Sequence, residues 1–74
     1  MIRNNVDRDL YGRVGARIQQ RRRHLDLTQA QLAEAVGICS SLVTHYEKGT
    51  RLIPLDTLVR VAKRLRVSLG DLVG

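Results

Sequence analysis

Residues 40–48, "SSLVTHYEK", carry short hydrogen-bonding side chains at a helical spacing. At about 100° per residue, the polar side chains fall within an arc of about 140°: Ser40, Ser41, Thr44, His45 and Lys48. Hydroxyl and imidazole groups donate and accept hydrogen bonds, and they are small enough to reach base edges in the major groove of DNA. The competing interpretation is that this face is only a solvated helix surface.

The opposite side of the same stretch is apolar and carries Leu42, Val43 and Tyr46. We expect Tyr46 to lie in the core, so that it anchors the helix from behind. A helix with an anchored back and a slim polar front is what a DNA-recognition helix requires.

A second short helix is predicted immediately before this one, in "LTQAQLAEAVG". Thr28 is a favourable N-cap, Gln31 completes a capping box and Gly37 ends the helix. Two helices joined by a turn of this length are typical of a helix-turn-helix, with the second helix over residues 39–48. Because helix N-termini favour phosphate, Gln29 and Gln31 are expected to contact the DNA backbone.

The remaining chain predicts three more helices and no strand, so the fold class is all-α. Apolar residues recur at steps of four and seven from Leu10, which indicates a helix after a flexible arm over residues 1–9, with Asp7 or Asp9 as its cap. We expect Asp26 to adopt the left-handed turn conformation after it. Pro54 suits the first turn of a fourth helix, and Ser68 begins the last one. An inward face of the fourth helix is expected at Leu55, Leu58, Val61, Ala62 and Leu65.

The composition describes a small and strongly basic domain. The 74 residues contain thirteen Lys and Arg against seven Asp and Glu, for a net charge of +6, and most of the cations are arginines. Such a charge favours a polyanionic partner. Nucleic acid, an anionic membrane surface and an acidic protein all remain open at this point.

Catalytic and metal-dependent functions are poorly supported by the residues present. Cys39 is the single cysteine, which excludes an intrachain disulfide and a multi-cysteine zinc site. Cys39 and His45 are six residues apart on one short helix, so their side chains are too far apart around the helix to act as a nucleophile and its base. We therefore expect no enzyme activity, no metal, no cofactor and no small-molecule ligand, and an inert, partly buried Cys39 rather than a redox sensor. No apolar run approaches a membrane span and no signal region is present, which predicts a cytoplasmic protein with no membrane partner.

Residues 14–73 resemble the Cro/C1-type helix-turn-helix family, also called the Xre family, of bacterial and phage regulators. The matching motifs are "VGARIQQRR", "LTQAQLAEAVGI", "SSLVTHYEKGTR" and "LDTLVRVAKRLRVSLGDL". The resemblance implies a compact five-helix, lambda-repressor-like DNA-binding domain over residues 10–74. It also implies a transcriptional regulator, a repressor or autoregulator, that binds double-stranded operator DNA as a homodimer.

The same resemblance implies roles for individual residues. It implies that the bases are contacted by Ser40, Ser41, Thr44 and His45. It implies that the DNA backbone is contacted by Gln29, Lys48, Thr50 and Arg51. An ion pair is implied between Arg22 and Glu47, which would also hold Arg22 near a phosphate. The sequence departs from the family pattern at Cys39, where Ser or Thr is usual, at Asp26, where Gly is common, and at Pro54.

Apolar residues outside the expected core suggest an interface with another protein chain. They are Leu52, Ile53, Val59, Leu69 and Val73. A homodimer seam is the interpretation we favour. The alternative is an antitoxin or a protein-binding regulatory subunit of the same fold. Arg3 and Arg8 could form a minor-groove arm, although a disordered tail is the simpler expectation.

Overall fold

The described part of the chain consists of α-helices and the turns between them. The computed structural model describes residues 2–74, with side chains from Asp9 onward. This range contains five helices and no strand: α1 Ile2–His24, α2 Gln29–Val36, α3 Ser40–Lys48, α4 Leu55–Leu65 and α5 Leu69–Val73. The prediction of an all-α, five-helix fold is confirmed.

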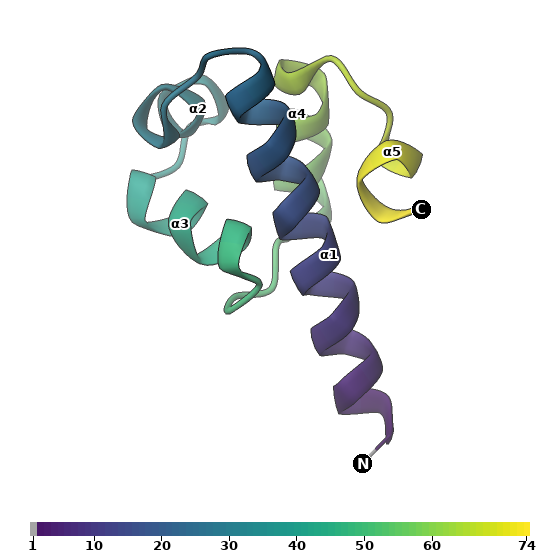
Figure 1. Ribbon diagram of the computed structural model, residues 1–74. Coiled ribbons are helices and arrows are strands. Elements are labelled where there is room, and N and C mark those ends of the chain that lie inside the picture. Colours follow the sequence, from purple (N-terminus) through teal and green to yellow (C-terminus); the bar gives the residue numbers. More distant parts are fainter. Residues whose placement is uncertain (1) are drawn as a thin grey trace.

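Helix α1 lies at the centre of the arrangement (Figure 1). Helices α2 and α3 lie on one side of it, α5 lies on the other side, and α4 lies behind. Helix α1 contacts α3, α4 and α5, while α2 contacts α3 and α4. The two helices of the helix-turn-helix are therefore each supported by a further helix.

Aliphatic side chains from all five helices meet in one core, as a chain without Trp or Phe requires. The largest of those that are almost completely buried are Ile18, Leu32, Val43, Val61, Leu65 and Leu72. Tyr46 is also buried, which confirms its predicted position on the inner side of α3. Packing of these aliphatic side chains is the main source of stability in a domain of this size.

Local capping residues define both ends of α2, as predicted, and the C-terminal end of α3. The Thr28 hydroxyl accepts a hydrogen bond from the Gln31 backbone N–H, and the Gln31 side chain accepts one from the Thr28 N–H. Gly37 and Gly49 end the two helices in the left-handed conformation, with φ of 78° and 73°. Asp26 has a φ of 58°, which confirms the left-handed turn after α1.

Two glycines allow α1 and the end of α3 to approach each other at backbone distance. A Cβ at Gly15 would overlap the Tyr46 carbonyl oxygen and lie 2.6 Å from that of Glu47. A Cβ at Gly49 would lie 2.8 Å from the Cα of Gly12, in addition to the strain of its positive φ. Larger residues at these positions would push α3 away from α1.

Helix α1 begins at Ile2, not at residue 10 as the hydrophobic periodicity predicted. Residues 2–11 contain no glycine or proline that would interrupt a helix, so the helix continues in the N-terminal direction beyond its last core contacts. Asp7 and Asp9 therefore lie within α1 and do not cap it. The flexible arm expected over residues 1–9, and the roles of Arg3 and Arg8, fall almost entirely outside the described side chains.

The prediction that Leu55 belongs to the inward face of α4 is wrong. Pro54 is the N-cap and Leu55 is the first helical residue, and its side chain is 69% exposed. Helical side chains lean toward the N-terminus, so the first one extends past the end of the helix and not over the core. The other four predicted residues of that face are buried, and Thr57 is buried beside them.

Candidate nucleic-acid interface

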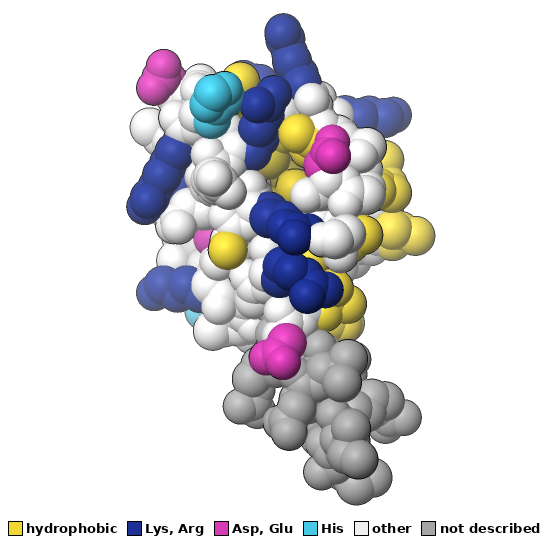
Figure 2. Space-filling view, turned by 45° about the vertical axis from the view of Figure 1, so that its right-hand side comes forward, with side chains coloured by type: hydrophobic (Ala, Val, Ile, Leu, Met, Phe, Trp, Pro, Cys, Tyr) yellow, Lys and Arg dark blue, Asp and Glu magenta, His cyan; other side chains and the backbone are white. Residues whose placement is uncertain are grey.

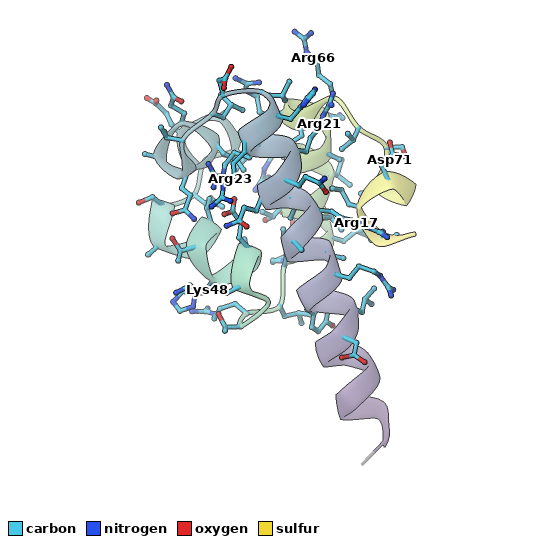
Figure 3. All side chains as sticks on the ribbon, in the orientation of Figure 1. Arg17, Arg21, Arg23, Lys48, Arg66 and Asp71 are labelled. Atoms are coloured by element: carbon cyan, nitrogen blue, oxygen red, sulfur yellow. The ribbon has the colours of Figure 1, made fainter. Side chains whose placement is uncertain are left out.

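Helix α3 separates its polar and apolar side chains as its sequence predicted. Ser40, Ser41, His45 and Lys48 are exposed, and Thr44 is half-buried. Val43 and Tyr46 are buried on the opposite side. The structure thus brings the predicted base-reading residues together on one outer surface, with Lys48 projecting from the end of the helix (Figure 3).

The expected ion pair between Arg22 and Glu47 is present beneath this surface. Arg22 Nε lies 2.6 Å from Glu47 Oε2, and Nη2 donates to Oε1 at 3.1 Å. The two side chains are only 9% and 1% exposed. Arg22 Nη1 also donates to the Leu27 carbonyl oxygen at 2.7 Å, so this one guanidinium connects α1, the following turn and α3.

Two glutamines complete the surroundings of the Glu47 carboxylate. Gln19 Nε2 donates to Oε1 at 3.3 Å, and Gln29 Nε2 donates to the same oxygen at 3.0 Å. A buried charge is tolerated only when it is paired and hydrogen-bonded. Among the described residues, no buried side-chain nitrogen or oxygen lacks a hydrogen-bond partner, so this polar network is complete.

Gln29 also reaches the outer face of α3. Its Oε1 accepts a hydrogen bond from the Thr44 hydroxyl at 2.8 Å. Gln29 is therefore placed between the buried pair and Thr44, one of the predicted base-reading residues. Gln31, the other glutamine expected at a phosphate, is exposed at the start of α2, with its oxygen engaged in the capping box.

The turn after α3 orders His45 and Thr50. His45 Nδ1 lies 2.8 Å from Thr50 Oγ1, and the Thr50 hydroxyl lies within 3.2 Å of the His45 carbonyl oxygen. The imidazole Nε2 has no partner among these contacts. Arg51 is exposed just beyond, so Lys48, Thr50 and Arg51 form a polar edge beside the helix.

Cys39 is exposed, whereas we expected it to be partly buried. It occupies the N-cap of α3, but its side chain makes no capping hydrogen bond. Its Sγ lies 3.2 Å from Ser41 Oγ. The hydrogen bond from the Ser41 hydroxyl, followed by that from the Leu42 backbone, lowers the pKa of the Cys39 thiol below its ordinary value.

The arginine side chains of α1 point in different directions and make different contacts. Arg23 lies on the same side of α1 as α3, whereas Arg17 extends toward α5 (Figure 3). Arg17 Nη1 donates to the carbonyl oxygens of Leu72 and Gly74, and Arg21 Nε donates to that of Leu65. Arg17 and Arg21 thus bind the ends of α4 and α5, which have free carbonyl groups.

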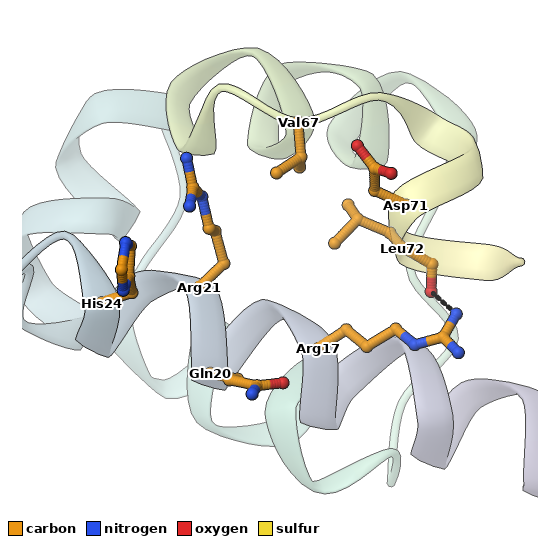
Figure 4. A pocket seen from close by; sticks show the side chains of 7 residues that line it. All are labelled: Arg17, Gln20, Arg21, His24, Val67, Asp71 and Leu72. Atoms are coloured by element: carbon orange, nitrogen blue, oxygen red, sulfur yellow. Dashed lines mark hydrogen bonds between the residues drawn. The ribbon is translucent and has the colours of Figure 1, made fainter.

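A pocket of about 350 Å³ lies between α1 and the α5 region (Figure 4). Arg17, Arg21 and His24 line it from α1, and Asp71 lines it from α5. Because α5 and α3 lie on opposite sides of α1, this pocket is remote from the polar face of α3.

Among the side chains from Asp9 onward, four large apolar ones are exposed. Leu52 and Leu55 are 62% and 69% exposed, and Leu69 and Val73 are exposed on α5. Hydrophobic side chains gather along the right-hand edge of the surface in Figure 2, next to Lys and Arg side chains. Ile53 and Val59 are half-buried, and Ile53 packs against the core. Of the expected interface residues, Leu52, Leu69 and Val73 are thus the most available.

A sequence model described as helix-turn-helix matches residues 18–72, which is most of the chain and includes α2 and α3. The chain belongs to the helix-turn-helix family. Within the described residues, no helix of this family member is long and apolar enough to cross a membrane.

Relatives of this helix-turn-helix protein include a transcriptional repressor and an antitoxin. It is 32% identical over 62 residues to the cryptic phage CTXphi transcriptional repressor RstR of Vibrio cholerae, covering 84% of this chain and 55% of that one. It is 33% identical to the antitoxin PezA of Streptococcus pneumoniae, covering 82% and 39%. The chain therefore spans about half or less of these relatives' length.

The fold is shared with a protein of similar size. The restriction-modification controller protein C.AhdI from Aeromonas hydrophila superposes with a TM-score of 0.82 at 26% identity. The match covers 88% of this chain and 94% of that one. This agreement extends over the whole helical domain and not only over the helix-turn-helix.

Sequence reasoning missed two residues of the site. Gln19 was not singled out, although it lies one helical turn before Arg22 and therefore on the same face of α1. Leu55 was assigned to the core, and only its position at the first turn of α4 could have indicated its exposure.

Proposed function

We propose that this protein is a transcriptional regulator that binds double-stranded DNA sequence-specifically, with α3 in the major groove. The observation that carries the proposal is the outer face of α3, held in place from behind by the buried Arg22–Glu47 pair. Ser40, Ser41, Thr44 and His45 are then the base-reading residues, and their hydroxyl and imidazole groups match base edges chemically.

The DNA backbone is contacted from both ends of this surface in the proposed complex. Lys48, Thr50 and Arg51 approach phosphates beyond α3, and Gln31 and the second N–H of Gln29 approach them from the start of α2. Arg22 is not included, although we expected it to contact a phosphate. Its guanidinium is buried and bound to Glu47 and Leu27, so its role is to brace the two helices.

Selection of binding sites from random duplexes tests this proposal. We expect one preferred, roughly palindromic sequence, with an affinity that falls steeply as salt rises because cations are released from the phosphates. Lys48→Ala should weaken binding to all sequences and reduce the salt slope by about one. Lys63→Ala, an exposed lysine on α4, is the matched control. The absence of any preferred sequence at every salt concentration would overturn the proposal.

We propose further that the protein acts as a homodimer with its recognition helices about one turn of DNA apart. The exposed apolar side chains of Leu52, Leu55, Leu69 and Val73 support this, since a patch of this kind is unfavourable in water. Ile53 and Val59 would border the seam. Sedimentation that shows only monomers at micromolar concentration, with and without DNA, would contradict it.

A second candidate function is that of an antitoxin or regulatory subunit that binds another protein. The relation to the antitoxin PezA and the exposed apolar side chains favour this alternative. Affinity capture from the native host distinguishes the two candidates. A stoichiometric foreign protein, bound through the apolar patch in place of a second copy, would favour the alternative.

A further inference from the structure

A chain of hydrogen bonds runs from the buried ion pair to the groove-facing hydroxyl of Thr44. It starts at Glu47, whose carboxylate is paired with Arg22 and can only accept hydrogen bonds. Gln29 lies 3.0 Å from Glu47 Oε1 and must therefore present its amide nitrogen to it. The acceptor-only carboxylate thus determines which way the Gln29 amide is turned.

The orientation of Gln29 in turn determines the direction of the Thr44 hydroxyl. The Gln29 amide oxygen lies 2.8 Å from Thr44 Oγ1 and can only accept. The other neighbour of Oγ1 is the Ser40 carbonyl oxygen at 3.3 Å, which is also only an acceptor. The single proton of Thr44 is therefore donated within the protein, and a lone pair and the methyl group remain for an outside partner.

We propose that Thr44 acts toward DNA as a hydrogen-bond acceptor and selects an exocyclic amino group at the base it contacts. The major groove offers two such groups, adenine N6 and cytosine N4. Guanine N7 and O6 and thymine O4 are themselves acceptors, and each would face a lone pair of Thr44. This inference rests on the proposed function, and it gives Gln29 a positioning role in base selection besides its phosphate contact.

Base analogues in the selected duplex test the direction of this hydrogen bond. Purine in place of adenine, or 2-pyrimidinone in place of cytosine, removes one amino group, whereas 7-deazapurines remove one N7 acceptor. We expect one amino deletion to weaken DNA binding by the wild-type protein about three- to tenfold more than it weakens binding by Thr44→Val. This difference in affinity is the size expected for one net hydrogen bond. Comparing the two proteins on each duplex cancels the weaker base pairing of the analogues.

Gln29→Met tests the positioning role, because it removes the amide but keeps a side chain of similar length. The hydroxyl of Thr44 then keeps only the weaker Ser40 acceptor and can also turn outward to donate, so we expect the penalty for replacing the amino-bearing base by guanine or thymine to shrink at that one position. Gln20→Met, at an exposed glutamine on α1, is the matched control and should retain the wild-type penalty. Circular dichroism confirms that each variant remains folded.

The outcomes separate this inference from the proposed function. Thr44-dependent coupling to a 7-deazapurine, or no coupling to any analogue in a duplex that is bound specifically, would overturn the acceptor role of Thr44. The second result is also the one expected if Thr44 touched only a thymine methyl group. A protein without any preferred duplex would overturn the proposed function, and this inference with it.

Discussion

Glu47 is an acidic side chain on the helix that we propose to meet a polyanion, and its partners explain its presence. It accepts hydrogen bonds from Arg22, Gln19 and Gln29, and its side chain is almost completely buried. It therefore contributes little repulsion at the DNA surface. Its effect is on position, because it connects α1 and α2 to α3.

Replacing Glu47 with alanine should weaken DNA binding although it removes a negative charge. The change leaves the Arg22 guanidinium buried without its partner, which costs about 3–5 kcal/mol in unfolding free energy. Urea denaturation measures the stability, and titration of the selected duplex measures the affinity. Glu34→Ala removes an exposed carboxylate of α2 and is the matched control. Tighter DNA binding by Glu47→Ala than by wild type would show that the carboxylate only repels phosphate.

Cys39 should react with iodoacetamide at a lower pH than an ordinary thiol. The thiolate is the nucleophile, and the hydrogen bond with Ser41 lowers the pKa of the thiol, so more thiolate is present at neutral pH. Ser41→Ala removes the largest cause and should move the midpoint of the rate profile upward. Ser40→Ala should leave it unchanged. Identical midpoints for wild type and Ser41→Ala would contradict this assignment.

At the scale of the helices, α3 is held by the direct approach of α1 as well as by side chains. Gly15 lies against the carbonyl oxygens of Tyr46 and Glu47, at the end of α3. The same helix supplies Arg22 and Gln19 to the Glu47 carboxylate. The angle at which α3 is presented therefore depends on how closely α1 packs against it.

Gly15→Ala and Gly12→Ala should have opposite effects on stability. At Gly15 the added methyl group meets backbone atoms that cannot move independently, and such overpacking costs about 1–3 kcal/mol. At Gly12 nothing lies within 4 Å of the added Cβ, so the higher helix propensity of alanine should add about 0.5–1 kcal/mol. Thermal denaturation of both variants measures the difference. Equal midpoints would show that α1 can shift away from α3 without cost.

Across the molecule, the polar face of α3 and the exposed apolar side chains lie on different surfaces. The outer face of α3 carries hydroxyl groups and an imidazole, whereas the exposed leucines lie before α4, at its first residue and on α5. A two-fold axis through the apolar side chains would leave α3 of each copy free for DNA. Most of the arginines whose side chains are described are exposed, so the long-range attraction to DNA that we propose would not depend on a single patch.

Leu52→Glu combined with Leu55→Glu should convert the proposed dimer to a monomer without unfolding it. Both side chains are exposed, so the fold loses little, whereas a carboxylate in an apolar seam is costly to desolvate. Sedimentation measures the association, and affinity for a palindromic duplex should fall with it. Ala35→Glu, at an exposed position on α2, is the control for added charge. An unchanged sedimentation coefficient would place the seam elsewhere.

Local sequence patterns predicted the five helices and most of the division between their inner and outer faces. Capping residues such as Thr28, Gln31, Gly37 and Gly49 act on neighbouring backbone groups, so their effect is readable from local spacing. The inner position of Tyr46 followed from helical periodicity for the same reason. The Arg22–Glu47 pair was available through resemblance to a known family.

The contacts between side chains of different helices follow from the three-dimensional arrangement and not from local spacing. Gln19, Gln29 and Thr44 join the Glu47 network because α1, α2 and α3 cross at particular distances, which no local pattern encodes. The exposure of Leu55 and Cys39 has a different cause, because each lies at the start of its own helix. The direction of the Thr44 hydroxyl is the clearest case, because it follows from an ion pair formed between residues 25 positions apart in the chain.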